Sequence, residues 1–228
     1  MTLSLQAASR NSSRRAEPNT VITDLLLLWA LLRTNGKPRT AEKPPPTVRS
    51  RMVADLDGKG RTVILRLDTT DSDPVTLIDG SRRVTFNMRA RWKPWSVTTA
   101  DLDGDGRREI VVAMYKSTRY IPQPHNCLFV YRYDGRQVYP LWLGSTLGRP
   151  FTAFVFCRAT DNTRDRLVTL DIGLDGRRCL TIHRWTGFGF HKERSFGNWQ
   201  RADLLSSRAG HVNVLADGKR LDLNMEDN

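Results

Sequence analysis

Internal repeats limit the folds open to this 228-residue chain more than any other feature. "KPWSVTTADLDGDGRREIVV", which begins at Lys93, aligns with "RPFTAFVFCRATDNTRDRLV", which begins at Arg149. "CLFVYRYDGRQVY" from Cys127 aligns in the same way with "CLTIHRWTGFGFH" from Cys179. An earlier copy starts at "MVADLDGKGRTVILRL", and a last, shorter copy reads "ADLLSSRAGHVNVLADGKRLDL". Repetition of this kind indicates stacked copies of one small structural unit.

Each unit is predicted to consist of β-strands. Short β-branched and aromatic runs, separated by Gly and Asp turns, occupy residues 63–67, 75–78, 110–113, 128–133 and 167–171. A full unit holds four such runs in about 45 to 55 residues, which is the size of one propeller blade. We therefore expect an all-β domain over residues 47–228, a small β-propeller of about four four-stranded blades with the last one incomplete.

The last unit is one strand short, and the sequence suggests two ways to complete the domain. Residues 47–52 could add the missing edge strand and close the ring. The alternative is an open fan of blades whose apolar end is covered by an N-terminal helix. The three cysteines, Cys127, Cys157 and Cys179, fall at positions too far apart on neighbouring blades to form disulfides and are predicted to be small buried hydrophobes.

Residues 101–110 read "DLDGDGRREI" and gather four acidic side chains in one short loop. Carboxylates at positions 1, 3 and 5, with glycines between them, can converge on one point, and such hard oxygen ligands suit Ca²⁺. The predicted ligands are Asp101, Asp103, Asp105, the backbone carbonyl of Arg107, and Glu109. An EF-hand does not fit, because position 12 is a valine and the loop runs into a strand.

The loop and the blade endings "RYDGRQVY" and "RWTGFGFH" resemble the FG-GAP/VCBS-type repeats of integrin-like β-propellers, and small bacterial proteins of this type in particular. The resemblance covers residues 50–225 and is faint in the last unit. It implies that the loop binds Ca²⁺ and stiffens the connection between blade strands.

The equivalent loops of the other units depart from this pattern. In the first unit Lys59 replaces the third acid beside Asp55 and Asp57, and its ammonium is expected to do the neutralising work of a metal. In the third unit two acids are lost, and the loop reads Cys157, Ala159, Asp161 and Asp165 at these positions. We expect metal only in the second unit, with a solvated Asp-Gly turn as the alternative there.

The chain carries 36 basic and 24 acidic residues, a net charge of +12. Beyond residue 50 the count is 28 basic against 21 acidic residues, a net charge of +7. Such a surface favours a protein or anionic polymer ligand, and nucleic acid remains a weaker possibility. The alternative is that this charge serves only solubility.

Arginines at positions 10, 14 and 15 precede an apolar run over residues 21–32, within an N-terminal segment that ends at residue 46. Basic residues followed by an apolar run are typical of a signal sequence or short membrane anchor. The run is short and contains Asp24, so a packed amphipathic helix and a cytoplasmic protein are the alternative. We expect an extracytoplasmic protein, secreted or membrane-anchored.

Residues 115–126, "YKSTRYIPQPHN", form an insertion longer than a hairpin needs and are a candidate ligand site. Its candidate residues are Lys116, Arg119, Tyr120, His125 and Asn126. Five tryptophans, Trp92, Trp95, Trp142, Trp185 and Trp199, recur near blade boundaries and are predicted to pack between sheets.

No fingerprint of a catalytic zinc, a nucleophilic serine or a phosphate loop occurs in the sequence. The expected function is therefore a non-catalytic, calcium-stabilised propeller that binds a protein or polymer. A polysaccharide lyase or hydrolase on the same scaffold is the main alternative. It would require two carboxylates flanking a cleft, and outside the acidic loop no such pair stands out.

Overall fold

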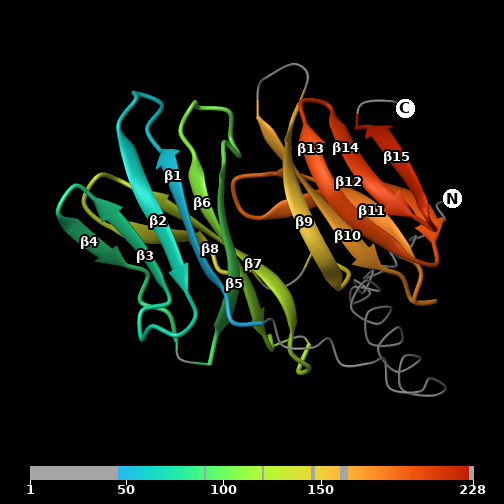
Figure 1. Cartoon of the computed structure of the whole chain (residues 1–228), viewed down its shortest axis with the longest axis horizontal. Helices are drawn as coiled ribbons and strands as arrows, with labels where there is room; N and C mark the ends of the chain where they lie inside the picture. The colour runs from blue at the N-terminus through green and yellow to red at the C-terminus, as the bar shows by residue number, and fades with distance from the viewer. Residues whose placement is uncertain (1–45, 90, 120, 145–146, 160–163, 226–228) are drawn as a thin grey trace, which may run out of the picture. The chain divides into compact units, whose positions relative to one another are not determined.

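The computed structural model describes residues 46–89, 91–119, 121–144, 147–159 and 164–225, and all its regular elements are β-strands (Figure 1). Blade 1 consists of β1 (Arg49–Asp55), β2 (Thr62–Asp68), β3 (Val75–Asp79) and β4 (Arg82–Thr85). Blade 2 consists of β5 (Lys93–Ala100), β6 (Glu109–Lys116), β7 (His125–Tyr133) and β8 (Val138–Trp142).

Blade 3 consists of β9 (Phe151–Arg158), β10 (Asp165–Ile172), β11 (Arg178–Trp185) and β12 (Phe190–Trp199). Blade 4 has three strands, β13 (Ala202–Arg208), β14 (His211–Ala216) and β15 (Lys219–Asn224). Within each blade every strand pairs antiparallel with its sequence neighbour. The four sheets adopt a four-bladed propeller arrangement, which confirms the predicted all-β architecture and the incomplete last blade.

The blades are held together by hydrophobic clusters that each join two consecutive sheets. Strand β6 shows how one strand serves two clusters, because successive side chains point to opposite faces of a sheet. Ile110, Val112 and Met114 pack against blade 1, whereas Val111 and Ala113 pack against blade 3. A third cluster joins blade 3 to blade 4 around residues such as Ile182 and Val214 on facing strands.

Among the described residues, the end blades contribute apolar side chains to one hydrophobic cluster each, although Thr76 is also buried on the other face of blade 1. In blade 1, Leu65 and Leu67 are buried, while Val53 on β1 is 62% exposed. In blade 4, Val214 is buried and Leu215 beside it is exposed. The clusters formed by described residues join blades 1 and 2, 2 and 3, and 3 and 4.

Of the two ways suggested for completing the domain, the one in which residues 47–52 add a strand to the last blade is wrong. Arg49–Asp55 is the first strand of blade 1 and pairs along its whole length with β2, from Arg49 opposite Asp68 to Asp55 opposite Thr62. Blade 4 keeps three strands. A strand whose pairing partner follows it directly in sequence forms a local hairpin. Closing this short loop costs less entropy than pairing with the far end of the chain.

Other expectations about the body are confirmed. The five strand-like runs lie in β2, β3, β6, β7 and β10. The three cysteines are buried and are not joined to one another by a disulfide. The five tryptophans pack in the clusters between blades, for example Trp92 edge-on against Phe129 with ring centroids 4.9 Å apart. The predicted N-terminal helix or signal segment lies outside the described residues, and no helix within the described part of the chain is long and apolar enough to cross a membrane.

Candidate functional site

The acidic loop connects the first two strands of blade 2 and is stabilised by its own carboxylates. The backbone N–H of Gly104 donates to Asp101 Oδ1 at 2.8 Å, and that of Asp105 donates to Asp103 Oδ1 at 3.2 Å. Gly104 and Gly106 adopt φ values of +83° and +82°, which glycine reaches without a steric penalty. The sequence thus folds into the tight turn that its glycine spacing predicts.

Three of the predicted ligands converge. One carboxylate oxygen each from Asp101, Asp103 and Asp105 lie within 4.8 Å of one another. Asp101 is buried, and the other two are exposed. An all-oxygen donor set with three carboxylates at this spacing fits Ca²⁺, which takes 6–8 oxygen ligands in flexible geometry. Arg107 lies exposed in the same loop.

Glu109 stands apart from this group. Its side chain is 1% exposed, and its Oε2 accepts the backbone N–H of Leu102 at 3.0 Å. Its Oε1 forms an ion pair with Arg132, whose guanidinium also lies 2.8 Å from Asp103 Oδ2 and 3.9 Å from Asp105 Oδ2. Burial raises the pKa of Glu109. The hydrogen bonds from Leu102 and Arg132 favour the ionised carboxylate and make this rise smaller.

Arg132 is a member of the site that the sequence reasoning missed. It lies on β7, and the pairing of Ile110 with Tyr131 places it across from Glu109. Directly opposed side chains on antiparallel strands interact, so the strand register contained the signal. Burial disfavours ionisation of Asp103, but the hydrogen bonds from Arg132 and from the Asp105 backbone hold its pKa below the usual value.

In the equivalent loop of blade 1, the carboxylate of Asp55 is stabilised by backbone N–H groups and not by the ammonium of Lys59. Asp55 accepts backbone N–H bonds from Asp57, Gly58 and Gly60, at 3.2, 2.9 and 2.8 Å. Among the described residues no carboxylate lies within ion-pair distance of Lys59, so the predicted ammonium bridge is wrong. Backbone donors take its place, because a tight turn points several N–H groups toward the first carboxylate.

The loop of blade 3 has lost its acidic core. Cys157 and Ala159 are buried apolar residues there, and Asp161 lies outside the described residues. Asp165, at the position of Glu109, is buried and faces blade 2. The backbone N–H of Asp101 donates to Asp165 Oδ2 at 2.9 Å.

These loops also fasten the blades to one another. The N–H of Arg108 donates to the carbonyl of Leu56 in blade 1 at 3.0 Å, and the N–H of Asp165 in blade 3 donates to the carbonyl of Asp101 at 2.7 Å. Gly58 lies so close to the blade 2 loop that a Cβ there would meet the carbonyl oxygen of Gly106 at 2.6 Å. The acidic loop is therefore the point at which three blades meet.

Four of the five candidate ligand residues in the insertion lie in the described part of the chain, and Lys116 lies opposite His125 in the pairing of β6 with β7. Lys116 ends β6, and its ammonium lies 5.1 Å from the centroid of Phe129. His125 is buried at the start of β7, and the amide of Asn126 donates to the carbonyl of Phe151 at 3.0 Å. Arg119 is exposed in the loop. Tyr120 lies outside the described residues.

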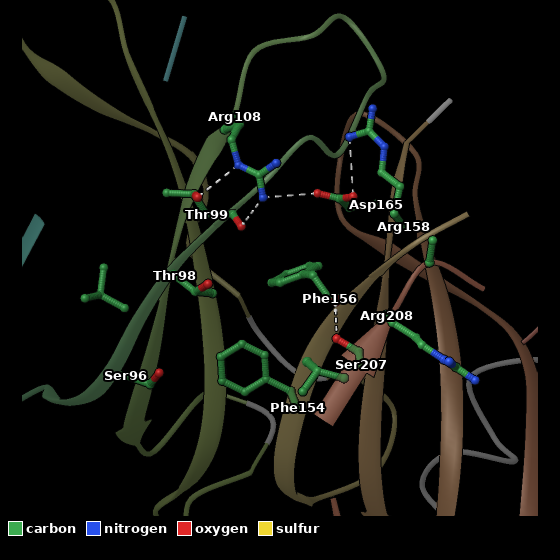
Figure 2. A pocket seen from close by; sticks show the side chains of 13 residues that line it. Ser96, Thr98, Thr99, Arg108, Phe154, Phe156, Arg158, Asp165, Ser207 and Arg208 are labelled. Carbon is green, nitrogen blue, oxygen red and sulfur yellow. Dashed lines mark hydrogen bonds and ion pairs between the residues drawn. The ribbon is translucent and has the colours of Figure 1, made fainter. Parts of the chain in front are cut away.

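A cleft of about 650 Å³ lies between the first strands of blades 2, 3 and 4, a place that no sequence motif marked. Its lining comes from β5, β9, β13 and the starts of β6 and β10. Figure 2 shows Arg108 and Arg158 on either side of Asp165 at one end of the cleft, and Ser96 beside the ring of Phe154 at the other. The volume falls within the range of about 300–1,000 Å³ found for small-molecule sites.

The charged end of the cleft is a fixed network. Arg108 donates from Nε to Thr99 Oγ1 at 3.0 Å and from Nη2 to the Thr99 carbonyl at 2.8 Å, and it lies 3.4 Å from Asp165. Nη1 of Arg158 lies 3.4 Å from Asp101 and 3.5 Å from Asp165. Asp101 therefore belongs both to the acidic loop and to the network beneath the cleft.

Comparisons with known proteins add no relative: no family model matches the chain, and a search of curated proteins finds no match.

Proposed function

We propose that this chain is a non-catalytic, calcium-stabilised β-propeller of the FG-GAP/VCBS type that binds an anionic polymer or protein outside the cytoplasm. The observation that carries the binding function is the cleft between β5, β9 and β13, which presents polar side chains from three blades on a rigid scaffold. Binding residues are commonly held in this way by a scaffold that does not itself move.

Support for calcium comes from the loop that carries Asp101, Asp103 and Asp105. Asp101, Asp103 and Asp105 would hold the ion, and its charge would relieve the repulsion among their carboxylates. Because the same loop bonds to blades 1 and 3, a bound ion would stiffen the junction of three blades. Glu109 is left out of the proposed ligand set, since Arg132 and the Leu102 N–H already satisfy its carboxylate.

Support for a non-catalytic role comes from the acid in the cleft. Asp165 is the one carboxylate among the described residues that line it, and it is paired with both Arg108 and Arg158. Glycoside hydrolysis needs two carboxylates about 5–10 Å apart on either side of the scissile bond. The described lining of the cleft offers one carboxylate, not such a pair.

Support for an extracytoplasmic location is the order of basic residues and apolar run over residues 10–32. A site with three carboxylates, two of them exposed, also suits surroundings rich in calcium. Extracellular calcium modules bind with Kd values of about 10⁻⁴ to 10⁻³ M.

The test is a titration of the full chain with heparin, with polyglutamate and with uncharged dextran, each in the presence of calcium. We expect at least one of the two anionic polymers to bind, with affinity that falls as the salt concentration rises, and dextran to show no binding. Failure of both anionic polymers to bind would refute the proposed function. Binding that is insensitive to salt would refute its electrostatic basis.

A further inference from the structure

The two ends of the cleft differ in chemistry. At one end Arg108 and Arg158 flank Asp165, and at the other Ser96 and Thr98 lie along β5 beside the ring of Phe154 (Figure 2). A ligand that fills the cleft therefore meets the guanidiniums of Arg108 and Arg158 at one end, and hydroxyls with an aromatic ring at the other.

The guanidiniums face the cleft, and their counter-charges lie beneath them. The side chains of Arg108 and Arg158 are 37% and 30% exposed, whereas those of Asp165 and Asp101 are 6% and 3% exposed. A ligand at this end thus encounters N–H donors and few carboxylate oxygens. The net charge of +7 beyond residue 50, from 28 basic and 21 acidic residues, adds a long-range field that favours an anion.

Arg108 is oriented before any ligand arrives. Its Nε and Nη2 are held by Thr99 and Asp165, and within the described part of the chain Nη1 has no partner. A guanidinium fixed on one side offers its remaining donors in a defined direction, which suits a carboxylate.

The end of the cleft near Phe154 offers hydroxyl groups that can still donate and accept hydrogen bonds. Among the described residues the hydroxyls of Ser96 and Thr98 have no hydrogen-bond partner, although both side chains are half-buried. The ring of Phe154 is fixed edge-on against Trp95, with centroids 5.7 Å apart. Hydroxyls beside an aromatic face match the polar edge and apolar face of a sugar ring.

We propose that the cleft between β5, β9 and β13 binds a uronic-acid unit of an acidic polysaccharide, with the carboxylate at Arg108 and Arg158 and the sugar ring between Phe154 and the hydroxyls of Ser96 and Thr98. This assignment rests on the proposed function, because it names the polymer that the propeller binds. It differs from an oligonucleotide site in that one aromatic ring and two hydroxyls recognise a single sugar.

The test is a titration of the full chain with polygalacturonate. The comparison polymers are neutral galactan of matched length, polyglutamate of matched charge and a single-stranded oligonucleotide. Polygalacturonate should bind most tightly, because only it offers carboxylate and sugar ring together. Equal binding of galactan would overturn the carboxylate assignment. Equal or tighter binding of polyglutamate or of a single-stranded oligonucleotide would overturn the sugar assignment.

Variants locate the site. Arg108→Gln should weaken polygalacturonate binding about tenfold, as expected for loss of a hydrogen bond to a charged group. Thr98→Val should weaken it about threefold, and it breaks no hydrogen bond of the described structure. Arg136→Gln is the matched control, since Arg136 is exposed in the turn between β7 and β8 and should leave affinity unchanged.

Melting curves of each variant show whether the protein is folded, and Thr98→Val keeps the test valid if Arg108→Gln is unstable. Wild-type affinity in both cleft variants would overturn the inference while the proposed function stands. Binding of polyglutamate without binding of polygalacturonate has the same meaning. Failure of all anionic polymers to bind the wild-type protein would refute both the uronic-acid assignment and the proposed function.

Discussion

Replacing Arg132 with methionine should destabilise the protein by leaving a buried carboxylate without its counter-charge. Glu109 is 1% exposed, Arg132 is 23% exposed, and after the change only the Leu102 N–H would still bond to the carboxylate. Breaking a buried ion pair by removing one partner costs about 3–5 kcal/mol. We expect about 3 kcal/mol, the lower end, because Arg132 is partly solvated and the Leu102 bond remains. For a domain of this size that corresponds to a fall in Tm of about 6–12 °C.

The destabilisation should depend on pH with a definite sign. Burial already raises the pKa of Glu109 in the folded protein, and loss of Arg132 removes one of the bonds that oppose this shift. A carboxyl whose folded pKa lies above its unfolded value contributes stability that is complete below the unfolded pKa, about 4.3 for Glu. That contribution is lost as the pH rises through the folded pKa. The gap between wild type and Arg132→Met should therefore be small near pH 4 and widen toward pH 7.

The assay is thermal and urea unfolding at several pH values, with two companion variants. Arg132→Met combined with Glu109→Gln should recover most of the stability at pH 7, since a neutral amide oxygen can still accept the Leu102 bond and needs no counter-charge. Arg136→Met changes an exposed arginine and should cost less than about 0.5 kcal/mol. The reasoning is refuted if Arg132→Met is no more destabilising than Arg136→Met, or if its effect is the same at pH 4 and pH 7.

Three further predictions concern the metal, the fold and the N-terminus. Calcium at 100 times its Kd should raise the free energy of unfolding by about 2.7 kcal/mol, which corresponds to a Tm about 5–10 °C higher than in chelator. Asp103→Ala should abolish this rise, and Asp57→Ala should keep it. Identical wild-type melting curves with calcium and with chelator would contradict the site. Circular dichroism of residues 46–228 should be β-dominated, and a helix content above about one third would be incompatible with the fold. A reporter fused to residues 1–45 should reach the membrane or the exterior, and a wholly cytoplasmic reporter would favour the packed-helix alternative.

Most of the fold could be predicted from the internal repeats. Each blade is a local hairpin array, so strand pairing depends on residues close in sequence, and the turn glycines Gly80, Gly135, Gly187 and Gly218 all adopt positive φ. The failure concerned residues 47–52, where pairing with the next strand or with the last blade depends on tertiary context. Strand propensity is alike for both partners, so it does not choose between them.

The candidate site was only partly accessible from sequence. The spacing of Asp101, Asp103 and Asp105 directly encodes their convergence, because a short glycine-containing turn leaves few other arrangements. Arg132 lies 23 residues from Glu109, and the cleft joins residues as distant as Ser96 and Arg208. Such sites depend on how blades stack, which a pattern of period two within one strand does not determine.

Because each hydrophobic cluster is shared by two consecutive blades, the domain behaves thermodynamically as a short one-dimensional array. Its stability is a sum of blade terms and nearest-neighbour interface terms, so disruption enters from the ends and travels inward one interface at a time. Blade 4, with three strands and one buried face, is the natural first unit to fray. Its loss would uncover Leu180 and Ile182 on blade 3 and would remove Ser207 and Arg208 from the cleft, so that the cleft would be lost before the acidic loop between blades 1 and 3 was disturbed.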